Sequence, residues 1–190
     1  MMELVNAWKE ALLSPNKALK SQKGKADLAK ALKNVLVSGL IAGILQGIAS
    51  YDAVIFLLTV IAYPILTVIG LLITSGVYYV FARLLGGKGS YTVQTYMISI
   101  FTAPMTVVIS FVLLIAMLET LSLLMLPVLV ILTLYSVYLS IIALREAHGY
   151  STLKAFVTWL IPLVIVMIFV ILAAAFLYTI FAEDLATGFV

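Results

Sequence analysis

The stretch SGLIAGILQG, residues 38–47, places glycines at Gly39, Gly43 and Gly47, one at every fourth position. Each glycine weakens a helix in water by about 1 kcal/mol relative to alanine. In lipid no hydrophobic force drives helices together, so close backbone approach over small residues stabilises their packing instead. Together with Gln46, these glycines predict a helix-packing ridge inside a membrane. A homodimer through the ridge is an alternative, less favoured because the chain itself supplies other helices.

The composition also indicates a membrane protein. Hydrophobic residues make up 65% of the 190 residues and charged residues only 10%, whereas soluble domains average about 45–50% and about 25%. The chain has no cysteine and one histidine, His148, which excludes disulfides, thiolate catalysis and multi-histidine metal sites. We expect no cofactor, no metal, no catalytic residue and no nucleic-acid partner.

Five apolar runs are long enough to cross a bilayer core about 30 Å thick, which needs about 20 helical residues. Their approximate ranges are 32–50, 54–85, 94–118, 121–144 and 155–182. The second run contains Pro64 but no polar turn, which favours one tilted or kinked helix over a helical hairpin. The sequence thus predicts an all-α, polytopic integral membrane bundle of five transmembrane helices over residues 32–190, preceded by a basic leader over residues 1–31.

The cations lie on one side of the predicted membrane. The eleven Lys and Arg residues fall in the leader (Lys9, Lys17, Lys20, Lys23, Lys25, Lys30, Lys33), the second loop (Arg83, Lys88) and the fourth loop (Arg145, Lys154). The first loop, the third loop and the C-terminal segment carry only acids: Asp52, Glu119, Glu183 and Asp184. Because short basic loops stay in the cytoplasm, the sequence predicts a cytoplasmic N-terminus and a C-terminus outside.

The leader itself has a helical pattern. The stretch MELVNAWKEALL, residues 2–13, predicts a short amphipathic helix whose Trp8 suits a membrane interface. A basic segment with Lys17, Lys20, Lys23 and Lys25 follows, and each such residue is worth about 1 kcal/mol near anionic headgroups. We expect the leader to lie on the bilayer and contact anionic headgroups on the cytoplasmic side. A soluble, partly disordered tail is the alternative.

Hydroxyl side chains recur on helical faces of the second to fourth runs. Apart from Lys33 and Arg83, near the ends of the first and second runs, no Asp, Glu, Lys, Arg or His lies inside the five runs, which argues against proton-coupled transport and intramembrane acid–base catalysis. Helix packing is the commoner reason for hydroxyl faces, and a polar pathway is the alternative. The candidate pathway residues are Thr67, Thr74, Thr102, Thr106 and Ser136.

Three stretches resemble the Yip membrane-domain family, named for interaction with Ypt/Rab GTPases. They are LLSPNKAL (residues 12–19), ARLLGGKGSYTVQTY (residues 82–96) and YSVYLSIIALREAHGYSTLKAF (residues 135–156). The resemblance implies five spans and a cytoplasmic N-terminus. The leader is shorter than the cytosolic segment of eukaryotic members and lacks their Asp-Leu-Tyr-Gly-Pro-like motif, so the resemblance points to the prokaryotic branch and implies a plasma membrane.

These observations favour a non-enzymatic integral membrane protein in membrane organisation, shaping or partner recruitment. The alternative is a small channel, permease or lipid-handling protein that uses the hydroxyl-lined faces of spans two to four. Either function is compatible with a protein partner or a homo-oligomer.

The charge distribution predicts the topology directly. Compartment reporters fused at the two chain ends are expected to report opposite sides of the membrane, because an odd number of spans separates them. A reporter inserted in the loop at Gly86–Gly89 is expected in the cytoplasm. Both chain ends in one compartment, or this loop outside, would contradict the five-span assignment.

Overall fold

The computed structural model describes the backbone of residues 2–187 and the side chains of residues 5–118, 120–179 and 181. Glu119, Glu183 and Asp184, part of the acidic set expected outside, have side chains beyond this description. Every regular element in the described range is helical. The elements are α1 (Met2–Leu13), α2 (Pro15–Gln22), the 3-10 turn η1 (Lys23–Lys25), α3 (Leu28–Ala49), α4 (Ala53–Leu84), α5 (Tyr91–Ala116), α6 (Glu119–His148) and α7 (Thr152–Thr187).

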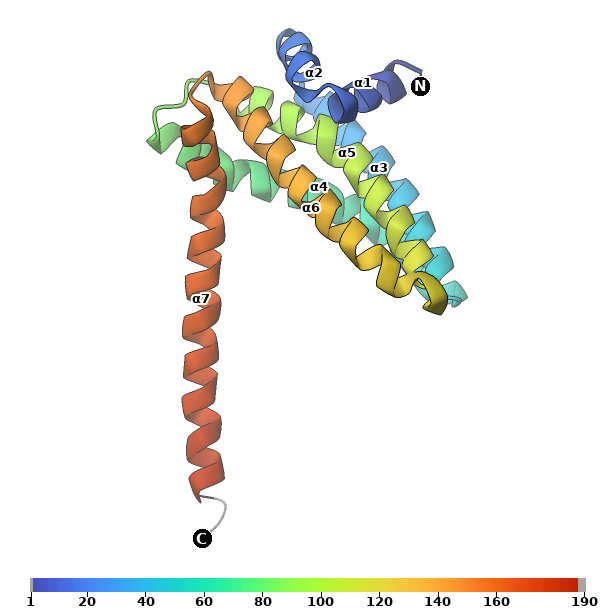
Figure 1. Ribbon diagram of the computed structural model, residues 1–190, viewed down its shortest axis with the longest axis vertical. Helices are drawn as coiled ribbons and strands as arrows, with labels where there is room; N and C mark the ends of the chain where they lie inside the picture. The colour runs from blue at the N-terminus through green and yellow to red at the C-terminus, as the bar shows by residue number, and fades with distance from the viewer. Residues whose placement is uncertain (1, 188–190) are drawn as a thin grey trace.

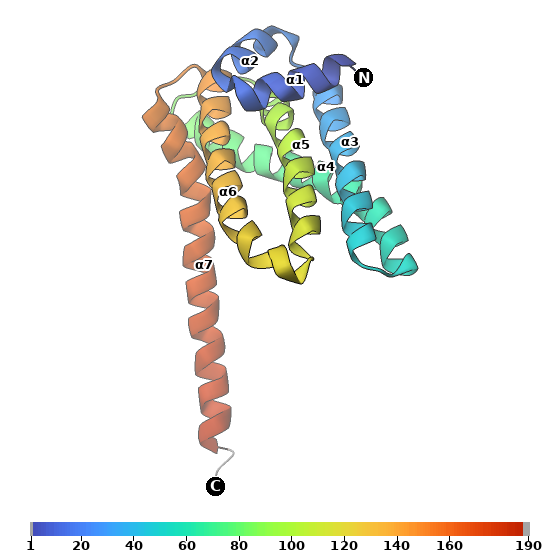
Figure 2. The same cartoon turned by 45° about the vertical axis from the view of Figure 1, so that its right-hand side comes forward.

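Five of these helices, α3 to α7, are long and apolar enough to cross a membrane. The predicted all-α membrane fold is therefore confirmed. The second run forms one continuous helix through Pro64, as predicted, rather than a hairpin. Its 32 residues extend over about 48 Å at 1.5 Å per residue, longer than a hydrocarbon core of about 30 Å. α4 accordingly runs obliquely across the bundle (Figures 1 and 2).

The glycine ridge of α3 lies directly against α4. A Cβ atom added at Gly39 would come within 2.7 Å of the Pro64 Cα, and one at Gly43 within 2.7 Å of the Thr59 carbonyl oxygen. At Gly47 it would meet the Phe56 ring at the same distance. The two backbones approach so closely that no side chain larger than hydrogen fits between them, which is the packing mode of membrane helices rich in small residues.

The helices differ widely in burial. α5 is the most buried of the five spans and lies beside α3 and α6 (Figure 2). Its buried apolar side chains form the centre of the core: Tyr96, Met97, Ile98, Ile100, Phe101, Ala103 and Met105. α7 is the least buried, and Figure 1 shows it diverging from the other helices toward the C-terminus. Because its stretch between Thr158 and Thr179 is apolar apart from Tyr178, lipid can solvate nearly the whole of this surface.

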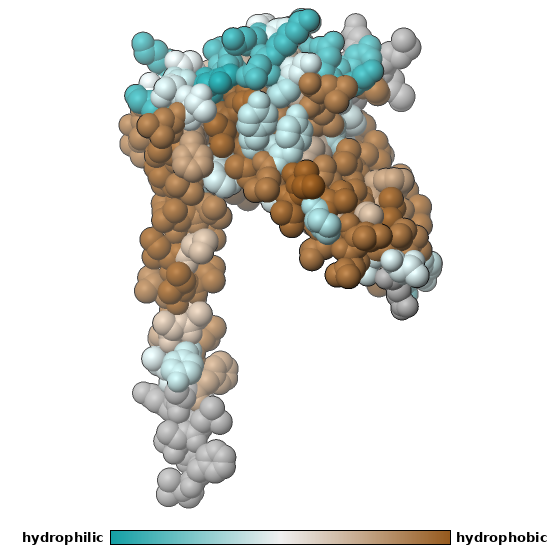
Figure 3. Space-filling view, in the orientation of Figure 1, coloured by the Kyte–Doolittle hydropathy of each residue, from teal (hydrophilic) through white to brown (hydrophobic). Residues whose placement is uncertain are grey.

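Polar side chains gather at one end of the molecule. The leader, the α4–α5 loop and the α6–α7 loop lie together there, and Figure 3 shows this end as a hydrophilic cap above an apolar body. Contacts between the three segments fix the arrangement: Lys23 reaches the Glu146 carbonyl, and Gly89 reaches the His148 ring. We call this part of the molecule the basic end.

The contact between α3 and α4 gives a test of the ridge. Gly39→Ala is expected to lower the free energy of unfolding by about 1–3 kcal/mol, because its Cβ collides with the α4 backbone and overpacks the interface. Gly70→Ala is the matched control, since a Cβ there has no atom within 4 Å. Thermal or denaturant unfolding in detergent measures both. Equal effects of the two substitutions would show that the ridge does not carry the packing.

Candidate functional site

The leader helices lie across the basic end of the bundle. Figures 1 and 2 show α1 and α2 resting over the ends of the spans, and we call these two helices the roof. Four hydrogen bonds tie the leader to α5 and α6: Tyr135 Oη to the Leu12 carbonyl, Tyr96 Oη to Gln22 Oε1 (3.1 Å), Lys23 Nζ to the Glu146 carbonyl (2.6 Å) and Arg145 Nη2 to Asn16 Oδ1 (2.6 Å). The leader is thus part of the folded bundle.

The apolar side of the roof faces inward. Ala11 and Leu19 are fully buried, and Trp8 and Leu12 pack against the core cluster of the bundle. The structure therefore places Trp8 against protein, with its buried indole Nε1–H lacking a hydrogen-bond partner. Among the side chains of α1 that the structure describes, the exposed large apolar ones are Val5 and Leu13.

The four leader lysines singled out from the sequence occupy three different positions. Lys17 and Lys20 are exposed on α2. Lys23 donates to the Glu146 carbonyl on α6. Lys25 lines a cavity below the roof. All four lysines are exposed, but Lys23 and Lys25 also contact the bundle or line the cavity, whereas Lys17 and Lys20 lie on the outer side of α2.

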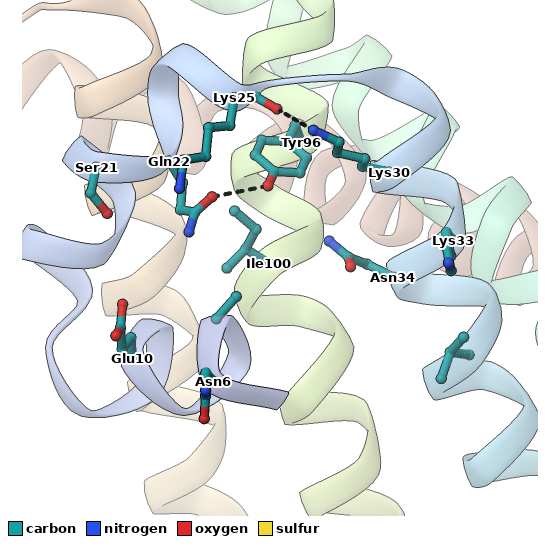
Figure 4. Close-up of a pocket in the computed structure, with 12 residues that line it drawn as sticks. Asn6, Glu10, Ser21, Gln22, Lys25, Lys30, Lys33, Asn34, Tyr96 and Ile100 are labelled. Atoms are coloured by element: carbon teal, nitrogen blue, oxygen red, sulfur yellow. Dashed lines mark hydrogen bonds between the residues drawn. The ribbon is translucent and has the colours of Figure 1, made fainter. Parts of the chain in front are cut away.

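The cavity below the roof has a volume of about 680 Å³, within the range of about 300–1,000 Å³ typical of small-molecule sites. Side chains from α1, α2, η1, α3 and α5 line it, as Figure 4 shows. The lining residues are Asn6, Ala7, Glu10, Ser21, Gln22, Lys25, Lys30, Lys33, Asn34, Val37, Tyr96 and Ile100. Polar side chains thus line the cavity on both the leader and the bundle side, and Val37 and Ile100 add apolar surface on the bundle side.

The charges around this cavity are mainly positive. Lys25, Lys30 and Lys33 contribute three ammonium groups, and Glu10 contributes one carboxylate. None of the three lysines forms an ion pair with a described carboxylate. The nearby Asp27 side chain accepts the backbone N–H of Lys30 at 2.9 Å and so caps α3.

The inner wall of the cavity is fixed by hydrogen bonds between helices. Asn34 is only 5% exposed and donates its amide to Ser99 Oγ at 3.0 Å. The Tyr96 hydroxyl donates a hydrogen bond to the side-chain oxygen Oε1 of Gln22. The cavity wall is therefore preorganised by contacts between α3 and α5 on one side and between α2 and α5 on the other.

A second polar cluster joins α4, α5 and α6 at the basic end. His148 is 2% exposed, and its Nε2 lies 2.7 Å from Gln94 Oε1. The fully buried Gln94 in turn donates its amide to the Ser75 carbonyl at 2.7 Å. The Gly89 N–H donates to His148 Nδ1 at 3.2 Å. Because Nδ1 accepts this bond, the ring is neutral and its proton lies on Nε2, which donates to Gln94.

Two glycines allow the α4–α5 loop to close over His148. A Cβ at Gly87 would lie 2.6 Å from His148 Nδ1, and one at Gly89 would lie 2.3 Å from the Ala147 carbonyl oxygen. The Lys88 N–H also donates to the His148 carbonyl at 3.2 Å. Sequence analysis did not find the hydrogen bond between Gly89 and His148, because these residues are 59 positions apart.

Tyr150 stacks on the histidine ring. The two rings stack with centroids 5.4 Å apart and planes 8° from parallel. Burial raises the pKa of Tyr150 above its ordinary value, although the hydrogen bond to Thr158 opposes this shift. The phenol therefore stays protonated at neutral pH and donates to Thr158 Oγ1 at 2.9 Å.

Comparison with known proteins assigns the family. The sequence profile of the Yip1 domain matches residues 9–174, from α1 to α7. The chain belongs to the Yip1 domain family. No curated protein and no solved structure matches it significantly. The match thus takes in α2, the later part of α1 and most of α7. The three stretches that carried the resemblance all contribute to the basic end, through Asn16, Gly89 and His148.

The structure disperses the candidate pathway residues of this Yip1 domain. Thr67 donates to the Val35 carbonyl of α3 at 3.2 Å, and both Thr106 and Ser136 donate to carbonyls one turn earlier in their own helices. Thr102 supplies the carbonyl for Thr106. Thr74 is exposed and lines a separate apolar cavity of about 280 Å³ between α4 and α7. None of the five lines the cavity below the roof.

Gln46 and several unpredicted residues hold polar contacts between helices. Gln46 donates to the Ser110 carbonyl of α5 at 3.2 Å, next to the glycine ridge. The sequence analysis assigned no role to Gln94 or Asn34. A signal was available, because a side-chain amide within or beside an apolar run is costly unless another helix provides its partner.

The histidine cluster yields a stability prediction. His148→Ala is expected to lower the free energy of unfolding by about 1–3 kcal/mol, because it leaves the buried Gln94 oxygen without its donor. The Gly89 amide should also exchange its hydrogen faster. Lys88→Ala is the control, since Lys88 is exposed in the same loop and bonds His148 only through its backbone. An unchanged Gly89 exchange rate in His148→Ala would argue against the contact.

Proposed function

We propose that this protein is a non-enzymatic membrane protein that organises or shapes the cytoplasmic leaflet through its leader. Membership of the Yip1 domain family and five membrane-crossing helices support a membrane role. The observation that carries the specific proposal is the roof, an amphipathic pair of helices bonded to the bundle and placed at its basic end. A helix held in this position adds area to one leaflet only, and that asymmetry favours membrane curvature.

The outward side of the roof suits an anionic surface. Lys17 and Lys20 are exposed on α2, and Val5 and Leu13 expose apolar surface on α1. Exposed cations attract anionic headgroups, while exposed apolar groups enter the boundary between headgroups and acyl chains. The same surface is available to a protein partner or to a second copy of the chain.

We place the basic end in the cytoplasm of a prokaryotic cell, at the plasma membrane, with the C-terminus outside. This orientation rests on the positive-inside rule and on the leader, the α4–α5 loop and the α6–α7 loop lying together. The channel or permease alternative finds no support in the positions of its five hydroxyl residues, and the test below separates it from membrane shaping.

Reconstitution into vesicles tests this proposal. The wild-type chain is expected to reduce vesicle diameter or form tubules without releasing a trapped dye. Lys17→Gln with Lys20→Gln should abolish most of the effect, because two exposed cations contribute about 2 kcal/mol of attraction to an anionic leaflet. Electron microscopy and dye release are the measurements.

The matched control is Lys17→Arg with Lys20→Arg, which keeps both charges and should keep the activity. Lys23 and Lys25 are left unchanged, because one bonds α6 and the other lines the cavity. Dye release by the wild-type chain would favour the channel alternative. Equal vesicle shaping by the glutamine and arginine variants would show that the charges of Lys17 and Lys20 are not needed for it.

A further inference from the structure

The cavity below the roof combines features that a surface for diffuse electrostatic contact does not need. It is a concave site with walls from five elements, and its inner wall is held by the Asn34–Ser99 and Tyr96–Gln22 hydrogen bonds. Lys25, Lys30 and Lys33 face it without an ion pair among the described carboxylates. Three cations around one cavity repel each other, so a bound anion relieves an unfavourable arrangement.

The donors around the cavity suit a phosphate group. Lysine ammonium groups bind phosphate as point charges, and Ser21 and Gln22 contribute further polar atoms to the wall. Lys25 and Lys30 also lie close together, since Lys30 Nζ donates to the Lys25 carbonyl at 3.4 Å. Glu10, on the α1 side of the cavity, is the single lining carboxylate among the side chains that the structure describes, and it lowers the affinity for an anion.

The position of the cavity favours a phospholipid over a soluble phosphate compound as its ligand. On α3, the lining residues Lys33 and Val37 continue at helical spacing to Ile41 and Ile44. Both isoleucines are exposed on this membrane-crossing helix. An exposed apolar strip thus begins where the polar cavity ends. A molecule with a phosphate in the cavity can lay acyl chains along this strip, which a free anion cannot use.

We propose that the cavity between the roof and the α3–α5 pair binds a single anionic glycerophospholipid, with its phosphate at Lys25, Lys30 and Lys33. The acyl chains lie along the α3 face that carries Ile41 and Ile44. The bound lipid bridges η1 and α3 below the roof, and it anchors the leader to one leaflet. This inference rests on the proposed function, which assigns the roof to the cytoplasmic leaflet. It adds a defined lipid-binding site to the general electrostatic attraction between the roof and that leaflet.

The test measures binding of short-chain phosphatidylglycerol to the full chain in zwitterionic detergent micelles, by native mass spectrometry. Lys30→Gln with Lys33→Gln is expected to weaken binding roughly 30-fold, since each cation contributes about 1 kcal/mol. Lys88→Gln with Lys154→Gln removes the same charge outside the cavity and should change binding less than about twofold. Unfolding temperatures of both double variants establish that each is folded.

A substitution in the opposite direction keeps the test decisive even if the lysine variants unfold. Glu10→Gln removes a lining carboxylate and should tighten binding about fivefold. No gain in affinity, or equal losses in the two lysine double variants, would overturn the site. Equal binding of short-chain phosphatidylcholine would show that the cavity does not select anionic over zwitterionic phospholipids. Competition by inorganic phosphate at the same concentration would assign the site to a free anion.

The outcome is separable from that of the proposed function. No vesicle is present in the binding measurement, so membrane shaping cannot contribute to it. Loss of lipid binding with retained vesicle shaping would refute the cavity site alone. Retained lipid binding with no vesicle shaping would refute the proposed function and leave the cavity site in place.

Discussion

The packing of this protein depends on one constraint, the lack of a hydrophobic force between helices in lipid. Helices must then be held by close backbone approach and by hydrogen bonds between side chains and backbones. α3 and α4 use the first means, with Gly39 and Gly43 against the backbone of α4. α3 and α5 use the second, through Asn34 to Ser99 and Gln46 to the Ser110 carbonyl. α7 lacks a polar face through most of its length and diverges from the bundle.

The basic end is built by polar contacts between distant segments. His148 connects α6 to the α4–α5 loop through Gly89 and to α5 through Gln94. Arg145 and Glu146, at the same end of α6, connect to the leader through Asn16 and Lys23. One end of α6 therefore organises both the loop and the roof. These contacts involve residues of all three stretches that resemble the Yip family.

The position of the leader changes the interpretation of its amphipathic pattern. Its amphipathic pattern indicated a helix at a membrane surface, but the apolar face with Trp8 and Leu12 packs on the bundle. The exposed face, with Lys17 and Lys20, is what remains for the membrane or a partner. Docking also creates a cavity that neither the leader nor the bundle forms alone, because its walls come from both.

The sequence by itself determined the five spans, the continuous second helix and the glycine ridge. These follow from local composition and from helical spacing, which need no knowledge of neighbouring segments. The tertiary structure alone decided which leader lysines contact the bundle, that Lys25, Lys30 and Lys33 line one cavity, and that His148 is buried beside Gly89. Such pairings join residues far apart in the chain. Helical periodicity fixes the face of a side chain within its own helix, but packing decides what that face meets.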